Sequence, residues 1–200
     1  MIRDAGVLGS FRLDDLVEAA QASAEQSRLV VLIDGPSGAG KTTLAGDLVA
    51  RLEECWAVPV QFVTLDDVYP GWHGLAAATA VVETTIVASE APGYRRYDWA
   101  TGSPAEWVSL DPLAPLVVEG SGALTVVSAS RATLRVWIEA DATTRQRNAF
   151  ARDGAGYEPW WDVWAAQERE HRLAHDPVAL ADVLINPYQG VWWRRADEAR

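Results

Sequence analysis

The stretch LVVLIDGPSGAGKTTLAGDLVARL, residues 29–52, constrains the fold of this chain more than any other segment. It opens with a continuous run of apolar, mostly β-branched residues, which is typical of a strand buried on both faces of a parallel sheet. Further along the stretch, apolar residues recur at the spacing of one helix face. Three glycines lie between the two patterns and permit tight turns. The stretch therefore predicts a strand over 28–34, a glycine-rich loop and a helix over 41–54.

The loop completes the pattern G-x-x-x-x-G-K-[ST] in Gly35, Gly40, Lys41 and Thr42. Between a strand and a helix, the backbone N–H groups of such a loop cradle a polyphosphate, aided by the helix N-terminus. Lys41 would reach the β- and γ-phosphates, and the Thr42 hydroxyl would bind Mg²⁺. The alternative, a glycine-rich turn without a ligand, is disfavoured by the complete pattern. The residues predicted to contact the nucleotide here are Gly35, Ser37, Gly38, Ala39, Gly40, Lys41, Thr42 and Thr43.

Lys41 is also the only lysine among 17 basic residues, the others all being arginine. A compact ammonium on a flexible stem fits a phosphate-binding loop in a way that a planar guanidinium does not. A coding bias towards arginine would explain the scarcity of lysine elsewhere, but it does not weaken the placement of the one exception. We therefore expect Lys41 to be catalytic.

The composition is that of a globular protein with a sizeable core, since 49% of the 200 residues are hydrophobic and 22% are charged. This length suits a single domain, 1–200. The net charge of −11 argues against nucleic-acid or anionic-membrane binding. No apolar run reaches the roughly 18 residues of a membrane span, the first residues do not read as a signal peptide, and a single cysteine fits a reducing compartment. We expect a cytoplasmic monomer or homodimer that acts on a small molecule.

Strand and helix patterns alternate along the chain, which predicts an α/β fold with a mostly parallel sheet of about five strands and helices on both faces. Strands are expected at 28–34, 58–66, 115–119, 133–140 and 181–187. Helices are expected at 12–26, 41–54, 74–89, 142–153 and 159–175, with a short helix or turn in 121–131 and a loop or hairpin in 93–107. Ligands of such sheets bind beyond the carboxyl ends of the strands, so the residues that follow each strand are candidates for the site.

Carboxylates follow two of the predicted strands. Asp66 and Asp67 end the second strand, and Glu119 ends the third. A carboxylate in this place can accept a hydroxyl proton or bind a metal ion, although acids are also common in turns and helix caps. Because side chains alternate along a strand, we expect Asp66 and Asp67 to point to opposite sides. Only one of them would then face a bound phosphate.

A second cluster of charge lies in RQRNAFARDGAGYE, where Arg145, Arg147 and Arg152 precede two glycines. Arginine suits the binding of a transferring phosphoryl group, and glycines can serve as hinges, so we interpret residues 145–160 as a small helical lid. Within it we predict that Arg145 contacts the nucleotide, Arg147 the substrate and Arg152 the transferring group. The alternative is an exposed helix face whose arginines pair with neighbouring acids.

The segments GPSGAGKTT, TLDDVY, RRYDW, VVEG, RxxxxRD and ADVLI occur in this order between residues 29 and 187. Together they resemble the motifs of the uridine kinase-like P-loop kinases, a group related to phosphoribulokinase and pantothenate kinase. The resemblance covers most of the chain. It implies a P-loop NTPase three-layer sandwich, ATP and Mg²⁺ as cofactors, and transfer of a phosphoryl group to a hydroxyl of a small metabolite.

The resemblance also implies roles for single residues. Asp66 would accept the proton of the acceptor hydroxyl, and Tyr69 would line the substrate pocket. Asp98, in the Tyr-Asp segment, would bind ribose hydroxyls. Glu119 would bind Mg²⁺ together with Thr42. In the lid, Arg152 is the best match to the arginine pattern of the family.

Two departures from the family pattern bear on the acceptor. Trp99 and Ala100 stand where uridine kinases usually have His-Pro, and Asn148 and Ala149 replace the paired arginines of the lid. Recognition of a base therefore does not transfer from the family, and the half that binds the phosphate donor matches better than the acceptor half. The tryptophans at 72, 99, 107, 160, 161 and 164 suggest an aromatic-lined pocket, although most tryptophans simply belong to a core.

These patterns predict an ATP-dependent small-molecule kinase with a nucleoside as acceptor, the main alternative being another hydroxylated metabolite. A GTP switch would need the motif Asn-Lys-x-Asp, which a chain without a second lysine cannot contain. An ATPase or regulator would favour an Asp-Glu pair after the metal-site strand, where this chain has Glu119 and Gly120. A nucleotide-binding module without catalysis stays open.

Overall fold

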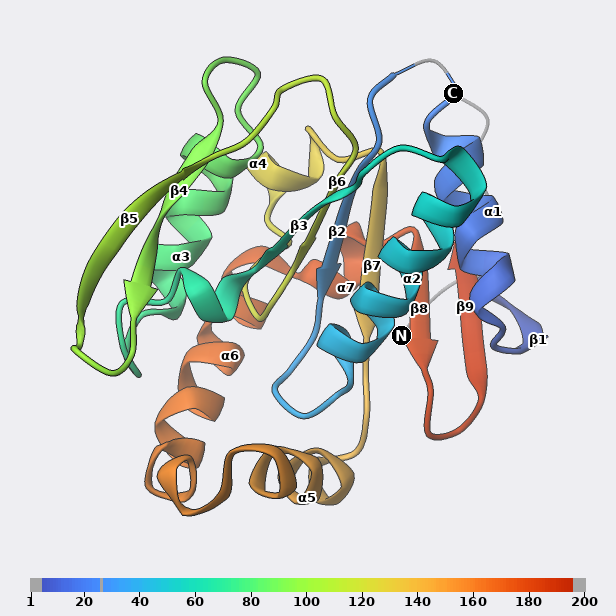
Figure 1. The fold of residues 1–200 in the computed structure, drawn as a ribbon. Helices are drawn as coiled ribbons and strands as arrows, with labels where there is room; N and C mark the ends of the chain where they lie inside the picture. Colours follow the sequence, from blue (N-terminus) through green and yellow to red (C-terminus); the bar gives the residue numbers. More distant parts are fainter. Residues whose placement is uncertain (1–4, 26, 196–200) are drawn as a thin grey trace.

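The computed structural model of the protein describes residues 5–25 and 27–195. A seven-stranded sheet of order β1-β9-β8-β7-β2-β6-β3 runs through its centre, and β4 and β5 form a separate two-stranded hairpin at its side (Figure 1). The strands are β1 (Ala5–Ser10), β2 (Val30–Asp34), β3 (Gln61–Thr64), β4 (Gly93–Asp98), β5 (Ser103–Ser109), β6 (Leu116–Glu119), β7 (Leu134–Ile138), β8 (Val183–Asn186) and β9 (Val191–Arg195).

Helices connect most of these strands. The α-helices are α1 (Leu13–Ser23), α2 (Lys41–Trp56), α3 (Leu75–Val81), α4 (Val126–Ala129), α5 (Ala142–Asp153), α6 (Trp161–His175) and α7 (Pro177–Leu180). Four shorter elements are the 3₁₀ turns η1 (Leu65–Asp67), η3 (Gly154–Gly156) and η4 (Glu158–Trp160) and the π-helical turn η2 (Val82–Ile86). None of the described helices combines the length and the apolar character needed to cross a membrane.

The five predicted strands, β2, β3, β6, β7 and β8, pair in parallel, with β2 between β6 and β7. Every residue of β2 is buried, as its continuous apolar sequence predicts. The side chains of alternate residues of β2 point to opposite faces of the sheet. Val31 and Ile33 pack with α1 and α2, whereas Val30 and Leu32 belong to the core on the side of α3 and α6 (Figure 1). The predicted three-layer α/β fold is confirmed.

Two strands of the sheet, β1 and β9, were not predicted from the sequence, and they extend the sheet in antiparallel fashion beyond β8. Two expectations about the predicted elements were wrong. The predicted helix 74–89 is α3 followed by η2, because Thr84 and Thr85 donate their hydroxyls to the carbonyls four residues earlier and disturb the regular helix. The predicted strand 58–66 already ends at Thr64, and the chain turns there into η1.

Candidate active site

The loop between β2 and α2 lies at the carboxyl ends of the parallel strands, above α5 in the view of Figure 1. Its shape requires glycine. Gly35 has φ +155° and Gly38 has φ +77°, and a Cβ atom would lie 2.2 Å from the Ile138 carbonyl oxygen at the first position and 2.1 Å from that of Arg145 at the second. Neither position can therefore carry a side chain without moving its neighbours. Close approach of other backbone segments thus requires glycine at 35 and 38, whereas at Gly40 it is the φ of +102° that favours glycine.

Lys41 begins α2 and is only 9% exposed. Its ammonium donates to the Pro36 carbonyl at 3.1 Å and to Ser121 Oγ at 3.3 Å. The first bond folds the side chain back over the loop, and the second joins it to the segment after β6. The only lysine of the chain therefore lies within the loop and at the wall of the cavity described below.

Glu119, at the end of β6, is 2% exposed and accepts hydrogen bonds on Oε1 from Thr42 Oγ1 at 3.1 Å and Thr64 Oγ1 at 2.7 Å. Burial raises the pKa of the Glu119 carboxyl, while the charge of Lys41 and the bonds from the two threonines act in the opposite direction. The arrangement gathers hydroxyl and carboxylate oxygens, which are the ligands that Mg²⁺ prefers. The predicted partners Thr42 and Glu119 are therefore in direct contact.

A cavity of about 880 Å³ opens beside the loop. The residues that line it are Ser37, Gly38, Gly40, Lys41, Thr42, Thr43, Asp66, Asp67, Tyr69, Trp72, Trp99, Glu119, Ser121, Asn148, Ala149, Ala151, Arg152, Asp153, Gly156, Tyr157, Trp164 and Tyr188. Most of the predicted donor and catalytic residues are thus brought together. Gly35 and Ala39 lie outside the lining, Gly35 in the backbone turn and Ala39 in the core.

Asp66 and Asp67 both line this cavity, contrary to the expectation that they point to opposite sides. That expectation rested on strand alternation, but the two residues belong to the 3₁₀ turn η1, in which successive side chains do not alternate. Asp66 is exposed and Asp67 is half-buried. Burial raises the pKa of Asp67, and the neighbouring charge of Asp66 adds to this, while Arg96 opposes it. Proximity alone therefore does not decide which of the two is the base.

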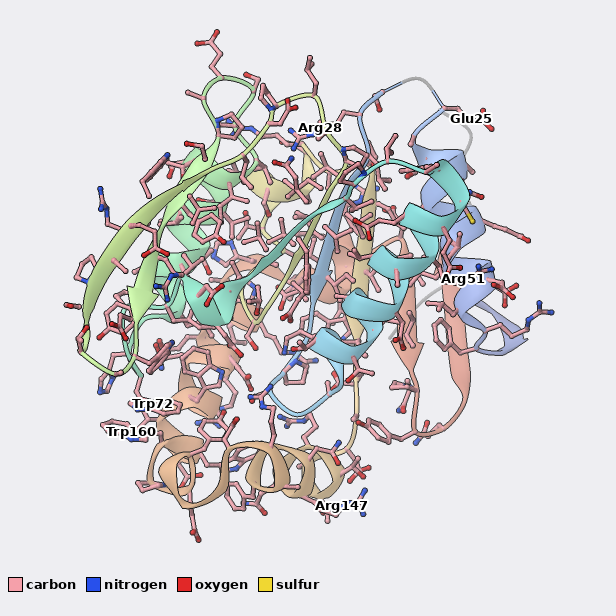
Figure 2. All side chains as sticks on the ribbon, viewed as in Figure 1. Glu25, Arg28, Arg51, Trp72, Arg147 and Trp160 are labelled. Atoms are coloured by element: carbon pink, nitrogen blue, oxygen red, sulfur yellow. The ribbon has the colours of Figure 1, made fainter. Side chains whose placement is uncertain are left out.

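The three arginines of the predicted lid have different surroundings. Arg152, in the last turn of α5, lines the cavity, where Asp153 forms an ion pair with it at 2.7 Å. Arg145 lies below the loop instead and donates to the Ser37 carbonyl at 3.3 Å, outside the cavity lining. Arg147 is exposed on the outer side of α5, away from the loop (Figure 2). The structure therefore does not bring Arg145 and Arg147 to the cavity for the contacts predicted from sequence.

Aromatic side chains form part of the cavity wall, among them Trp72, Trp99 and Tyr157, with Trp160 packed behind them. Trp72 is at their centre, with its ring stacked on Tyr157 at 5.2 Å and on Trp160 at 5.6 Å and edge-on to Trp99 at 5.0 Å. Figure 2 shows Trp72 and Trp160 side by side at the end of α6. Trp99 remains 41% exposed, although its indole N–H donates to the Asp66 carbonyl at 2.7 Å. The pocket suggested by the tryptophan-rich sequence thus has an aromatic wall.

Other predicted acceptor-side residues have structural partners. Tyr69 is buried, lines the cavity and donates its hydroxyl to the Ser121 carbonyl at 2.9 Å. Asp98 lies outside the lining and closes the β4–β5 turn by accepting the N–H groups of Ala100 and Thr101. These bonds lower the pKa of Asp98. Trp107, also counted among the pocket tryptophans, lies outside the lining on β5.

Sequence reasoning missed four residues that meet at the loop. Ser121 contacts Lys41, and Asn148 donates to the Gly38 carbonyl at 2.9 Å and to the Tyr188 hydroxyl at 2.7 Å. Glu168 accepts the N–H of Ser37 at 2.6 Å. Ser121 follows Glu119 directly in a small-residue turn, which is a signal that could have found it. Asn148, Glu168 and Tyr188 carry no local signal, because their places depend on how α5, α6 and the β8–β9 turn pack.

Comparisons with known proteins agree with this architecture. No protein-family model matches the sequence, and no curated protein does. Among solved structures, a "possible uridine kinase" from Bacillus stearothermophilus superposes with a TM-score of 0.62 at 21% identity, over 86% of this chain and 96% of the other. A "putative fructose transport system kinase" from Silicibacter sp. TM1040 superposes with a TM-score of 0.52 at 15% identity, over 90% and 94%. The chain therefore has the fold of P-loop kinases, as its ordered motifs predicted.

Proposed function

We propose that the protein is an ATP-dependent kinase that transfers the γ-phosphoryl group to a hydroxyl of a small metabolite, with a nucleoside as the acceptor. One observation carries the proposal. A single cavity joins the phosphate loop, with Lys41 and Thr42, to the carboxylates Asp66 and Glu119. Phosphoryl transfer requires this combination, because the enzyme has to position the two reactants and neutralise charge on the transferring group.

The residues present fit ATP and Mg²⁺. A glycine-shaped loop at a helix N-terminus presents backbone N–H groups to phosphate oxygens, and Lys41 adds a positive charge. Thr42 and Glu119 would hold the metal ion, directly or through water. Bound Mg²⁺ would neutralise charge on the phosphates. Beneath the loop, Arg145 supports the Ser37 peptide, so in our proposal it acts on the nucleotide only through the loop.

In the proposed reaction, Asp66 orients the acceptor hydroxyl and takes its proton. The acceptor oxygen forms a bond to the γ-phosphorus while the bond from that phosphorus to the β,γ-bridging oxygen breaks, and ADP leaves with the electron pair. Lys41 and Arg152 stabilise negative charge on the transferring group, since both line the cavity as cations. Arg152 would have to share its guanidinium between Asp153 and the phosphoryl group.

The charges around the cavity favour an uncharged acceptor. Lys41 and Arg152 are the cations among the described lining residues, and the proposed reaction engages both with the phosphates. Away from the phosphate loop, the lining instead has the carboxylates of Asp66 and Asp67 and the aromatic rings of Trp72 and Trp99. Among the described lining residues of this part none is cationic, so a phosphate or carboxylate group on the acceptor would meet no opposite charge in the lining. A ring that stacks on an aromatic wall and presents hydroxyls would suit it, as a nucleoside does.

A second acceptor class, a sugar or another hydroxylated metabolite, deserves the same test, because Trp99 replaces the residue expected in uridine kinases and one structural neighbour is named as a fructose transport system kinase. The experiment measures ADP release from ATP with Mg²⁺, with and without a panel of nucleosides, sugars and sugar alcohols. We expect release that depends on an uncharged acceptor. Release without any acceptor would favour an ATPase, and nucleotide binding without release would favour a non-catalytic module.

A further inference from the structure

Glu168 has no role in the reaction as written above, yet it is a buried acid that contacts the phosphate loop directly. It lies on α6, is 7% exposed, and its Oε1 accepts the N–H of Ser37 at 2.6 Å and the hydroxyl of Ser121 at 3.1 Å. Burial raises the pKa of Glu168, whereas Lys41, Ser37 and Arg145 act in the opposite direction. A carboxylate in so apolar a place is costly unless it is well bonded, so these contacts account for its presence.

The bond to Ser121 leads on to Lys41. The Ser121 hydroxyl accepts from the Lys41 ammonium at 3.3 Å, and its own proton has two neighbouring acceptors, Glu168 Oε1 at 3.1 Å and the Gly35 carbonyl at 2.9 Å. A hydroxyl has one proton and donates to only one of them at a time. When Glu168 takes this proton, the lone pairs of Ser121 are left for Lys41, so Glu168 competes with the Gly35 carbonyl for control of the hydroxyl.

Arg145 completes the arrangement from the other side. Its Nη1 donates to the Ser37 carbonyl at 3.3 Å and lies 3.8 Å from Glu168 Oε2. The N–H of Ser37 therefore donates to the carboxyl of Glu168 on α6, and the carbonyl of Ser37 accepts from the guanidinium of Arg145 on α5. Most of α5 belongs to the predicted lid 145–160 and α6 begins directly after it, so the loop is held by side chains far away in sequence.

Glu168 shares one face of α6 with two other inward residues. Trp164 lies one turn before it and packs edge-on against Tyr69 at 4.7 Å, and His171 lies about one turn after it and pairs with Asp34 Oδ2 at 3.0 Å. Spacings of four and three residues place the three side chains on a single helix face. Because Trp164 and His171 anchor α6 on either side of Glu168, the Glu168 side chain has little freedom to move away from the loop.

We propose that Glu168 is a positioning residue, which fixes the Ser37 peptide of the phosphate loop and, through Ser121, sets the place of the Lys41 ammonium. The inference rests on the proposed function for its catalytic meaning, although the placement of Lys41 can be observed without turnover. A purely structural Glu168 would hold α6 against the loop and act on Lys41 only through its charge, independently of Ser121. The two roles therefore differ in what happens to the lysine of a folded variant.

The sequence offers a direct probe, since Lys41 is the only lysine. Protein grown with lysine labelled by ¹³C at Cε gives a single lysine signal by NMR. The variants are Glu168→Gln, which keeps the side-chain shape and removes the charge, and Ser121→Ala, which breaks the connection while leaving Glu168 and Ser37 in contact. Glu170→Gln is the matched control, because Glu170 is exposed on the same helix. Circular dichroism and thermal melting establish that each variant is folded.

We expect the nucleotide-free Lys41 signal to shift in Glu168→Gln and in Ser121→Ala and to stay unchanged in Glu170→Gln. In the double variant Glu168→Gln/Ser121→Ala, the shift should fall short of the sum of the two single shifts, because Glu168 acts on Lys41 through Ser121 as well as through its charge. A folded Glu168→Gln protein with an unchanged signal overturns the proposal, and so does a double variant in which the two shifts add. Should Glu168→Gln not fold, an unchanged signal in Ser121→Ala overturns it equally.

Measurements of turnover form the second part of the experiment. On an acceptor found by the panel, both single variants should lower kcat by about tenfold or more, the effect of losing a hydrogen bond to a charged group, with a smaller change in the KM for ATP. A wild-type Lys41 signal that does not respond to ATP and Mg²⁺ would count against the proposed kinase. The positioning of Lys41 by Glu168 would still be judged from the nucleotide-free spectra, so the two failures remain distinguishable.

Discussion

The donor half and the acceptor half of the cavity are built in different ways. The donor half consists mainly of residues 37–43, a continuous stretch whose backbone conformation is fixed by glycines, and its Lys41 is buried. The acceptor half combines side chains from η1, from Trp72 after it, from the β4–β5 hairpin, from Tyr157 before η4 and from α6, and its Trp99 is 41% exposed. The first therefore depends on local backbone geometry, and the second on how distant elements pack.

This difference has a consequence for chemistry. In the proposed kinase, the backbone cradle would bind any nucleoside triphosphate in much the same way, so the donor half would specify the reaction class. Side chains on a packed wall can change without loss of the fold, so the acceptor half specifies the substrate. Substitutions in the two halves should accordingly affect different steps.

The largest effect should come from Asp66, at the border between the halves. Asp66→Asn keeps the size of the side chain and removes the proton-accepting charge, so transfer should fall by about a hundredfold to ten-thousandfold. Binding of ATP should survive, because the loop is untouched. The measurements are ADP release with a proven acceptor and calorimetry with ATP.

Asp67→Asn is the matched comparison, since Asp67 lines the same cavity but is half-buried. We expect it to have the milder effect. If Asp67→Asn is inactive while Asp66→Asn turns over the same acceptor, the roles of the two carboxylates are exchanged.

Lys41→Ala tests the donor half. Removing one group that stabilises the transferring charge typically lowers the rate by about a hundredfold to a thousandfold. Lys41→Arg should also be poor, because the ammonium sits between the Pro36 carbonyl and Ser121, a space that does not suit a planar guanidinium. Circular dichroism should show both variants folded. Near-normal ADP release by a folded Lys41→Ala protein would refute the mechanism.

The same contrast explains what the sequence could predict. The strand, the loop and the helix of the donor half follow from spacing and glycine positions that act over a few residues. Lys41 and Thr42 followed from this pattern, and Glu119 from its place at a strand end and from the family resemblance; all three line the cavity. The five parallel strands also followed from periodicity, whereas β1 and β9 lie at the ends of the chain, where no strand pattern was identified.

The acceptor half depends on contacts that periodicity does not encode. The alternation assumed for Asp66 and Asp67 failed because the chain leaves the strand at Thr64. Arg145 was expected at the nucleotide because arginines favour phosphates, but it pairs with Glu168, whose approach depends on the packing of α6. The sequence shows which charged residues are present, but it does not show which of them form ion pairs in the fold.

Arg152→Ala should have a smaller effect than Lys41→Ala, because the Arg152 side chain is 51% exposed and Asp153 already pairs with it. We expect kcat to fall by about tenfold to a hundredfold, as for loss of a hydrogen bond to a charged group, with little change in ATP affinity. Arg147→Ala, on the exposed side of the same helix, should change kcat less than twofold or so. A larger loss in Arg147→Ala would restore the substrate contact predicted for Arg147 from sequence.

The smallest effect should come from the acceptor wall. Trp99→Leu removes an exposed ring that the bond to the Asp66 carbonyl holds in place, so the KM for the acceptor should rise by about threefold to tenfold, as for loss of one aromatic contact. The KM for ATP should stay the same. Trp107→Leu serves as the control, because Trp107 lies on the same hairpin, is 46% exposed and does not line the cavity.

Trp99→Phe separates the ring from its hydrogen bond. It keeps an aromatic face and loses the indole N–H that reaches Asp66. If stacking is what Trp99 contributes, the acceptor KM of Trp99→Phe should stay near that of the wild type. If the bond instead fixes η1 and with it the proposed base, kcat should fall in Trp99→Phe and Trp99→Leu alike, with the acceptor KM unchanged. That second outcome would assign Trp99 to the positioning of Asp66, the proposed base, and not to the binding of the acceptor.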